Sequence, residues 1–425
     1  MSATDRETDR DEAFLRDFQS MSAFGRTPAG GVERQAATAE DGRLRSWFRG
    51  LMEANGFTVG YDAIGNQFAL RELVPGAPYV FLGSHLDSQP RGGRFDGAYG
   101  VLAAAHAAMR LSERARAGSW RPSCNLAVVN WFNEEGSRFK PSMMGSSVFT
   151  GKLGAQEALA TRDADGVTVA EALERIGTVD PSGGFAVPKP AAYLEIHIEQ
   201  GRSLEDAGLT IGVVESTWGV VKHDFVVHGE QAHTGATRIA DRRDALLGAA
   251  LLVVEARRIS ERFSDEEHEV ITSCGELTVL PNSPVVVARE VRLLVDLRCS
   301  DPERLAEADA ELRRRIAEIE REASVRIEER AGHAWPAKGY GAAGVALARR
   351  IAAQLELPHG VVRTLAGHDS TNLRDLVPTI MLFVPSAQGV SHSEQEFTSD
   401  EDMLAGLRML TATLEQVAGG ELPED

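Results

Sequence analysis

The stretch Gly83-Ser-His-Leu-Asp-Ser-Gln-Pro-Arg-Gly-Gly-Arg-Phe-Asp-Gly97 carries the strongest structural signal in this chain. It follows a short apolar run, Tyr79–Gly83, and leads into Gly97–Glu113, which is predicted to form a helix. Apolar runs of this length are typical of strands that are covered on both faces of a sheet. A strand, a Gly-rich loop and a helix in this order predict an α/β domain.

The same alternation occurs elsewhere in the chain. Leu126–Phe132 and Tyr193–Ile198 are further apolar runs of strand length that end in polar or Gly residues. Near the C-terminal end we expect a helix at Ala343–Leu355, a buried strand at Thr379–Val384 and a terminal helix at Asp400–Val417. The first and last parts of the chain, residues 1–208 and 332–425, are therefore predicted to form one α/β domain.

Residues 209–331 follow a different pattern, ββαββαβ, which predicts a small inserted α+β domain with helices on one face of a sheet. Its first two strands are expected to pair with each other. The expected strands are Ile211–Glu215, Val220–Val227, Val270–Cys274, Val285–Leu297 and Val325–Glu329, and the expected helices are Arg242–Glu261 and one that starts near Pro302.

Composition excludes several classes of protein. The 425 residues include 43% hydrophobic and 25% charged residues, which is ordinary globular composition. The net charge of −18 argues against a nucleic-acid partner, because such a protein needs a basic face. The apolar run Ala245–Val254 is too short to span a membrane. Three dispersed cysteines and a charged N-terminal stretch predict a cytoplasmic protein without disulfides.

Four clusters of His and acidic residues follow the predicted strands. His85 and Asp87 share a face at one strand end, and Asp96 lies in the following Gly-rich loop. Glu134-Glu135, His197 and His392 complete the set. Taken singly, each cluster also has an ordinary structural interpretation, such as a helix N-cap for Asp96 or a solvated turn for the two glutamates.

The expected position of these clusters near the ends of neighbouring strands favours one shared site over the separate interpretations. Open α/β sheets bind ligands beyond the carboxyl ends of their strands, where three of the clusters are expected. Imidazoles and carboxylates without thiolates suit Zn²⁺, Mn²⁺, Ni²⁺ or Co²⁺. The residue types do not choose among these metals.

The motifs GSHLDS, GGRFDG, NEEGSRF, EIHIEQG, AGHDS and GVSH, in this order, resemble those of two-metal amidohydrolases related to aminoacylases and glutamate carboxypeptidases. Within that superfamily the chain is similar to the branch of N-carbamoyl-L-amino-acid amidohydrolases, two-zinc β-ureidopropionases and allantoate amidohydrolases. The resemblance implies a mixed-sheet, aminopeptidase-like catalytic domain with an inserted ferredoxin-like domain. That insert would serve as a lid and as the surface of a homodimer.

The resemblance also implies a ligand set for two divalent metal ions, of which zinc is the first expectation. His85 and His197 would hold one ion, Glu135 and His392 the other, and Asp96 would bridge them. It implies further that Asp87 orients His85 and that Glu134 is the general base. His233 would stabilise the oxyanion in the partner protomer's site. The positions that contact substrate in relatives are Gln200, Arg298 and His368.

The implied reaction is hydrolysis of an N-carbamoyl-L-amino acid to the amino acid, ammonia and carbon dioxide. Allantoate, another ureido acid or an N-acyl amino acid is an alternative substrate, and a dimeric binding protein without turnover is an alternative of another class. Val285 stands where relatives commonly carry a substrate-contacting Asn, and Thr234–Ile239 also departs from the usual pattern. These departures leave the metal positions intact and bear on substrate identity.

Overall fold

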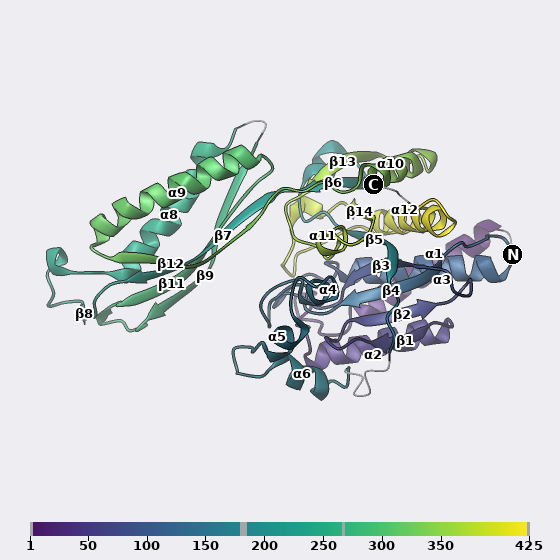
Figure 1. Cartoon of the computed structure of the whole chain (residues 1–425), viewed down its shortest axis with the longest axis horizontal. Coiled ribbons are helices and arrows are strands. Elements are labelled where there is room, and N and C mark those ends of the chain that lie inside the picture. The colour runs from purple at the N-terminus through teal and green to yellow at the C-terminus, as the bar shows by residue number, and fades with distance from the viewer. Residues whose placement is uncertain (1–2, 179–184, 266–267, 423–425) are drawn as a thin grey trace. The chain divides into compact units, whose positions relative to one another are not determined.

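In the computed structural model, which describes residues 3–178, 185–265 and 268–422, the chain forms two compact units. The first comprises Met1–Glu215 and Tyr340–Asp425, and the second comprises Ser216–Gly339 (Figure 1). The expected insert, residues 209–331, begins and ends a few residues before the observed second unit. Each unit is an α/β layer structure with its own core.

The first unit is built on a mixed sheet of eight strands. In spatial order these are β1 (Thr58–Tyr61), β2 (Gln67–Arg71), β4 (Asn125–Trp131), β3 (Tyr79–His85), β5 (Pro190–Ile198), β14 (Thr379–Val384), β6 (Ile211–Thr217) and β13 (His359–Thr364). β4, β3, β5 and β14 run parallel, so their carboxyl ends meet at one edge of the sheet.

Both faces of this sheet are buried, which explains the continuous apolar runs. Val80 and Leu82 of β3 belong to the largest core cluster, whereas Phe81 between them packs with Trp131 and Tyr193 on the other side. The main helices are α1 (Ala3–Met21), α2 (Ala39–Ala54), α3 (Ala98–Arg116), α10 (Ala342–Gln354) and α12 (Asp400–Ala418). The short ones are α4 (Met144–Phe149), α5 (Ala155–Ala160), α6 (Val169–Arg175), α7 (Ser203–Ala207), α11 (Ser370–Leu373) and the 3₁₀ turn η2 (Ala387–Gly389).

The expected pairing of Ile211–Glu215 with Val220–Val227 is wrong. β6 instead lies beside β14 in the large sheet, where Val213 is opposite Leu382. The physical reason is burial: consecutive residues of β6 from Ile211 to Val214 are buried, and only a sheet covered on both faces offers that environment. This strand therefore belongs to the first unit, which moves the boundary of the insert.

The second unit is ferredoxin-like. Its strands β7 (Gly219–His228), β9 (Val270–Leu280), β11 (Glu290–Cys299) and β12 (Arg326–Trp335) form an antiparallel sheet in the order β12-β7-β11-β9. Helices α8 (Ala245–Phe263) and α9 (Pro302–Ala323) pack on one face of it. The expected strand Val285–Leu297 divides into β10 (Val286–Val287), which pairs with β8 (Ala232–His233), and β11; η1 (Ile239–Asp241) is a 3₁₀ turn.

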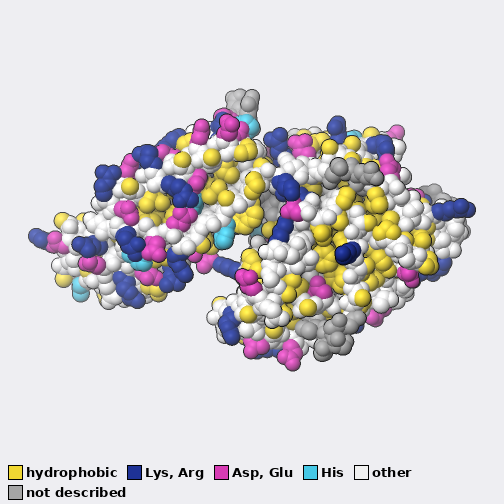
Figure 2. Space-filling model, viewed as in Figure 1, with side chains coloured by type: hydrophobic (Ala, Val, Ile, Leu, Met, Phe, Trp, Pro, Cys, Tyr) yellow, Lys and Arg dark blue, Asp and Glu magenta, His cyan; other side chains and the backbone are white. Residues whose placement is uncertain are grey.

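Helix α9 shows how sequence and packing agree in this unit. Asp301 caps its first turn, Pro302 occupies the first position, and Leu305, Leu312 and Ile319 bury one apolar stripe. Its outer face carries ion pairs such as Arg314 with its neighbouring glutamates. Figure 2 shows basic and acidic side chains close together over this unit. Among the described residues, no helix has the length and apolar character of a membrane span.

Candidate metal centre

Two histidines project from neighbouring parallel strands at the same edge of the large sheet. His85 is the last residue of β3, and His197 is the penultimate residue of β5. Both are 1% exposed, and their ring centroids lie 5.8 Å apart. Pairing of β3 with β5 therefore brings together two residues that are far apart in the sequence.

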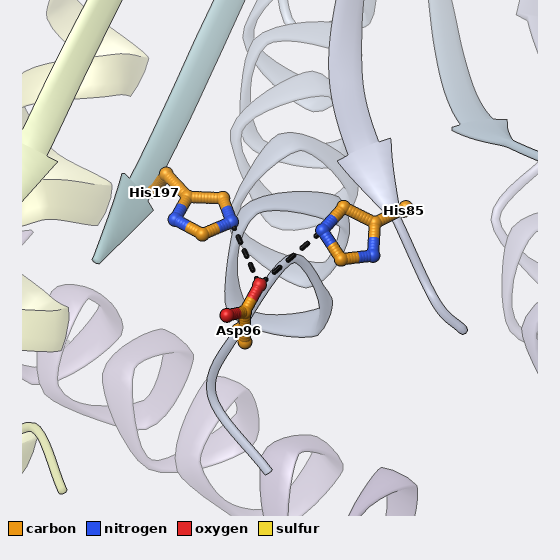
Figure 3. Close-up of side chains that lie close together, drawn as sticks. All are labelled: His85, Asp96 and His197. Carbon is orange, nitrogen blue, oxygen red and sulfur yellow. Dashed lines mark ion pairs between the residues drawn. The ribbon is translucent and has the colours of Figure 1, made fainter. Parts of the chain in front are cut away.

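Asp96 reaches both rings from the loop before α3 (Figure 3). Its Oδ1 lies 3.3 Å from His85 Nε2 and 3.1 Å from His197 Nε2. A tight turn positions this carboxylate: Gly97 has φ 60° and ψ −49°, and Ala98 N–H donates to the carbonyl of Asp96. Gly97 is required there because a Cβ would lie 2.3 Å from His85 Nε2.

The tautomers of both histidines follow from their second nitrogens. His85 Nδ1 lies 3.0 Å from the carbonyl oxygen of Asp87, and His197 Nδ1 lies 2.8 Å from that of Ile198. Because a carbonyl can only accept, each Nδ1 carries a hydrogen. Each Nε2 faces Asp96, and that of His197 also lies 3.0 Å from the N–H of Gly97. Nε2 is therefore the ring nitrogen that a cation beside Asp96 would bind.

A second group of ligand atoms shares Asp96. His392 Nε2 lies 3.4 Å from Asp96 Oδ2 and 3.4 Å from Glu135 Oε2. The ligand atoms within each of the two groups, His85–Asp96–His197 and Asp96–Glu135–His392, lie within 4.8 Å of one another. Asp96 therefore presents one oxygen to each group, as a carboxylate between two cations would.

Asp87 contacts His85 through its main chain. Its main-chain carbonyl, rather than its carboxylate, contacts His85 Nδ1, and the carboxylate Oδ1 is 3.7 Å away. The carboxylate instead accepts the N–H groups of Glu134 and Glu135 at 3.2 and 3.3 Å. Asp87 thus ties the turn after β4 to the end of β3.

Glu134 lies within reach of the first group. Its Oε2 is 3.5 Å from His85 Nε2, and the side chain is almost fully buried. Burial raises the pKa of Glu134 well above its usual value, His85 opposes this rise, and Asp369 and Glu135 add to it. A carboxylate with increased proton affinity beside the ligand atoms is suited to general base chemistry.

The donor set fits a pair of divalent cations. Asp87, Asp96 and Glu134 are buried, and the side chain of the neighbouring Glu135 is only 5% exposed. Burial together with Asp96 raises the pKa of Glu135 to about 7. Burial of several neighbouring carboxylates costs free energy of folding unless cations neutralise their charge. Nitrogen and oxygen ligands without thiolates match zinc, manganese, cobalt or nickel.

Two of the three expected substrate contacts border these groups. Gln200 has φ 59°, and its Nε2 lies 2.6 Å from Asp96 Oδ2. The ring of His368 lies 4.6 Å from that of His197, and its Nε2 is 3.1 Å from Thr364 Oγ1. Burial and the neighbouring His197 lower the pKa of His368 well below its usual value, so this ring is neutral.

His233 and Arg298, the remaining expected site residues, belong to the second unit. His233 Nδ1 accepts the N–H groups of Gly235 and Ala236 at 3.0 and 3.1 Å, so its Nε2 carries the hydrogen. Arg298 lies on the sheet face opposite the helices, where Asp296 binds its guanidinium at 2.8 and 3.1 Å. Val285 is 58% exposed and its carbonyl accepts an N–H group from the residue after His233.

Sequence reasoning missed three residues that support the ligands. Gln89 donates from its main chain to Glu135 Oε1 at 3.0 Å and from its side chain to Oε2 at 2.8 Å. Ser391 and Glu396 contact Asp96 from the loop that carries His392. All three lie inside or beside the quoted motifs, but only tertiary structure identifies which ligand each one contacts.

Known proteins are similar to this chain over most of its length. The family model described as peptidase family M20/M25/M40 matches residues 81–416. A relative from Mycolicibacterium smegmatis, described only as a hydrolase, is 56% identical over 98% of this chain and 95% of its own length. An N-carbamoyl-L-amino acid amidohydrolase from Geobacillus stearothermophilus is 35% identical over 96% of this chain and 99% of its own.

The solved structures include one that is similar over nearly the whole length. It is an amidase of the hydantoinase/carbamoylase family from Burkholderia vietnamiensis. Its TM-score is 0.88 at 35% identity, and the match covers 97% of this chain and 98% of that one.

Proposed function

Because the chain belongs to peptidase family M20/M25/M40, we propose that it hydrolyses the ureido C–N bond of an N-carbamoyl-L-amino acid. It is a hydrolase of C–N bonds other than peptide bonds. Water adds to the ureido carbon and one C–N bond breaks. The carbamate that remains then loses carbon dioxide as its own C–N bond breaks, so the products are the amino acid, ammonia and carbon dioxide. The observation that carries the proposal is the meeting of two ligand groups at Asp96 beside Glu134.

Enzymes of this family depend on two metal ions, and the proposed ligands follow the two groups described above. His85 and His197 would hold one ion, Glu135 and His392 the other, and Asp96 both. The ions would supply Lewis acidity, which lowers the pKa of a water molecule and polarises the ureido carbonyl. Zinc is the metal that we expect first.

Glu134 performs the proton transfers in this proposal. Its raised proton affinity allows it to take a proton from the attacking water and to deliver it to the leaving nitrogen. Asp87 assists by fixing the backbone of Glu134.

The proposed substrate contacts come from residues of both units. Arg298 presents a planar fork that suits the substrate carboxylate, and Asp296 holds that fork in a defined orientation. A local N–H group binds Nδ1 of His233, so the ring hydrogen is on Nε2. This Nε2–H can donate to an oxygen that gains negative charge. Gln200 and His368 would contact the substrate from beside the metal groups.

We also propose a homodimer through the second unit, in which His233 serves the partner's site. Helix α8 supports this proposal because it is apolar on more than its buried face. Leu246, Leu247 and Val254 are between 44% and 46% exposed, whereas Leu252 of the same helix is buried. A helix that is apolar all round is normally covered on both sides.

Allantoate is the second candidate substrate, since the branch also includes an allantoate amidohydrolase. Val285 leaves the choice between them open, because loss of the polar residue that relatives commonly carry changes the contacts open to the substrate. A screen of ammonia release over carbamoyl amino acids, allantoate and acyl amino acids, with the metal varied, separates these candidates. Preference for allantoate over every carbamoyl amino acid would overturn the first proposal.

Glu134→Gln tests the mechanism. We expect a loss of at least about 10²-fold in kcat with two metal ions still bound, because general base catalysis contributes about 10²–10⁴-fold. Glu12→Gln, on the exposed face of α1, is the matched control and should keep full activity. Stoichiometric binding of substrate by the wild type without ammonia release would instead identify a binding protein.

Mixing experiments test the shared site. His233→Ala and Glu134→Gln proteins, each inactive alone, should regain part of the activity when hybrid dimers form. Each hybrid then contains one site with both residues intact. Hybrids that form without any regained activity would show that His233 does not act across the dimer.

A further inference from the structure

The proposed ligands differ in what holds them. His85 and His197 stand on strands, and Asp87 and Gln89 hold Glu135 after β4. Asp96 and His392, in contrast, lie in loops that come from opposite ends of the sequence. The spacing of the second ligand group therefore depends on how these two loops are joined.

A single buried carboxylate joins them. Glu396 Oε1 accepts the N–H groups of Phe95 and Asp96, both at 3.0 Å. The chain segments at Gly93 and Glu396 lie very close together. A Cβ on Gly93 would lie 1.9 Å from Glu396 Oε1. Glu396 is 5% exposed and has its two oxygens directed at different parts of the site.

The other oxygen of Glu396 faces the loop that carries His392. Glu396 Oε2 lies 3.0 Å from the hydroxyl of Ser391, the residue immediately before His392. The same hydroxyl lies 3.0 Å from Asp96 Oδ2, and Gln200 Nε2 lies 3.2 Å from it. His392 has φ 54°, a backbone conformation that needs such support from its surroundings.

We propose that Glu396 is a positioning residue that sets the distance between Asp96 and His392 and so assembles the second ligand group. The inference rests on the proposed metal pair and adds a residue that binds no metal itself. Its loss should affect the Asp96–Glu135–His392 group most, because two ligands of the other group stand on strands. Loss of such a supporting contact typically lowers metal affinity about 10–100-fold.

The test compares variants of the full-length protein. Glu396→Ala should weaken binding of the second Mn²⁺ or Co²⁺ ion about 10–100-fold, measured by competition with a chelator and by metal content after dialysis. Glu396→Gln should restore most of the affinity. Its amide oxygen can still accept both N–H groups, and its amide nitrogen can donate to Ser391, which remains free to donate to Asp96.

Glu394→Ala is the matched control in the same loop. Glu394 binds Thr27 and Arg91, so this variant removes a tether of the loop without touching Asp96. Equal loss of metal in Glu394→Ala, or no rescue by Glu396→Gln, would overturn the proposal. If Glu396→Ala fails to fold, Ser391→Ala provides the test, because this variant should weaken binding of the second ion only.

The outcomes for the wild type keep the two proposals apart. A wild-type protein that binds no divalent ions refutes the proposed function together with this inference. A wild type with two ions and a folded Glu396→Ala variant with two ions of unchanged affinity refutes the role of Glu396 only.

Discussion

Replacement of Gly97 by alanine should damage the centre of the proposed metal site. The new Cβ would lie 2.3 Å from His85 Nε2, 2.4 Å from Cε1 and 2.5 Å from Cδ2, against ordinary contacts of 3.4–4 Å. His85 is 1% exposed, so its ring has little room to withdraw. Backbone strain at this φ costs about 1–3 kcal/mol, and an overpacked core adds about 1–3 kcal/mol.

The free energy of unfolding of Gly97→Ala should therefore fall by about 2–6 kcal/mol, measured by urea denaturation. Where the ring moves instead, the loss should be seen as weaker metal binding at the His85–Asp96–His197 group. Gly118→Ala is the matched control, because Gly118 has φ 71° and nothing within 4 Å of the added Cβ. Equal stabilities for both variants, with metal affinity unchanged in Gly97→Ala, would refute the reasoning.

Three further predictions concern stability. Asp41→Ala should lower the free energy of unfolding by about 3–5 kcal/mol, because it leaves the fully buried Arg45 without its carboxylate; a loss under about 1 kcal/mol would contradict this. Burial lowers the pKa of His223, but hydrogen bonds to Asp309 and Glu329 outweigh burial and raise it. Wild type should therefore exceed His223→Leu in thermal stability most clearly below about pH 6.5, and the difference should shrink as pH rises; a difference that grows with pH would contradict this. Addition of Zn²⁺ or Mn²⁺ at about 100 times its Kd should stabilise the protein by about 2.7 kcal/mol per site in thermal unfolding, and an unchanged melting temperature would exclude binding to the folded state.

Local patterns predicted most of the elements, because burial on both faces of a sheet leaves continuous apolar runs. The strand at Thr379–Val384 and the helix at Asp400–Val417 are examples, and both are confirmed within one residue. The partner of β6 was not predictable in this way. Its apolar run is typical of a strand covered on both faces, but such a run does not indicate which strand lies beside it, and only the packing of the whole first unit selects β14.

The site was predictable only in part, for a similar reason. Residues at strand ends, such as His85 and His197, converge because the parallel register brings them to one edge. The contacts of Gln89 and Glu396 depend on how loops fold onto each other. The spacing of residues in the sequence does not indicate how these loops fold. Asp87 acts on His85 through its carbonyl, a group that every residue has and that no motif can reveal.

The order of the sheet has a consequence for synthesis of the chain. β5 pairs with β14, yet the ribosome must complete the whole of Ser216–Gly339 before β14 is made. During that interval β5 has an unpaired edge on this side, while the ferredoxin-like unit has everything it needs to fold. His392 leaves the ribosome later still, so a nascent chain cannot assemble its full complement of metal ligands before translation is almost finished.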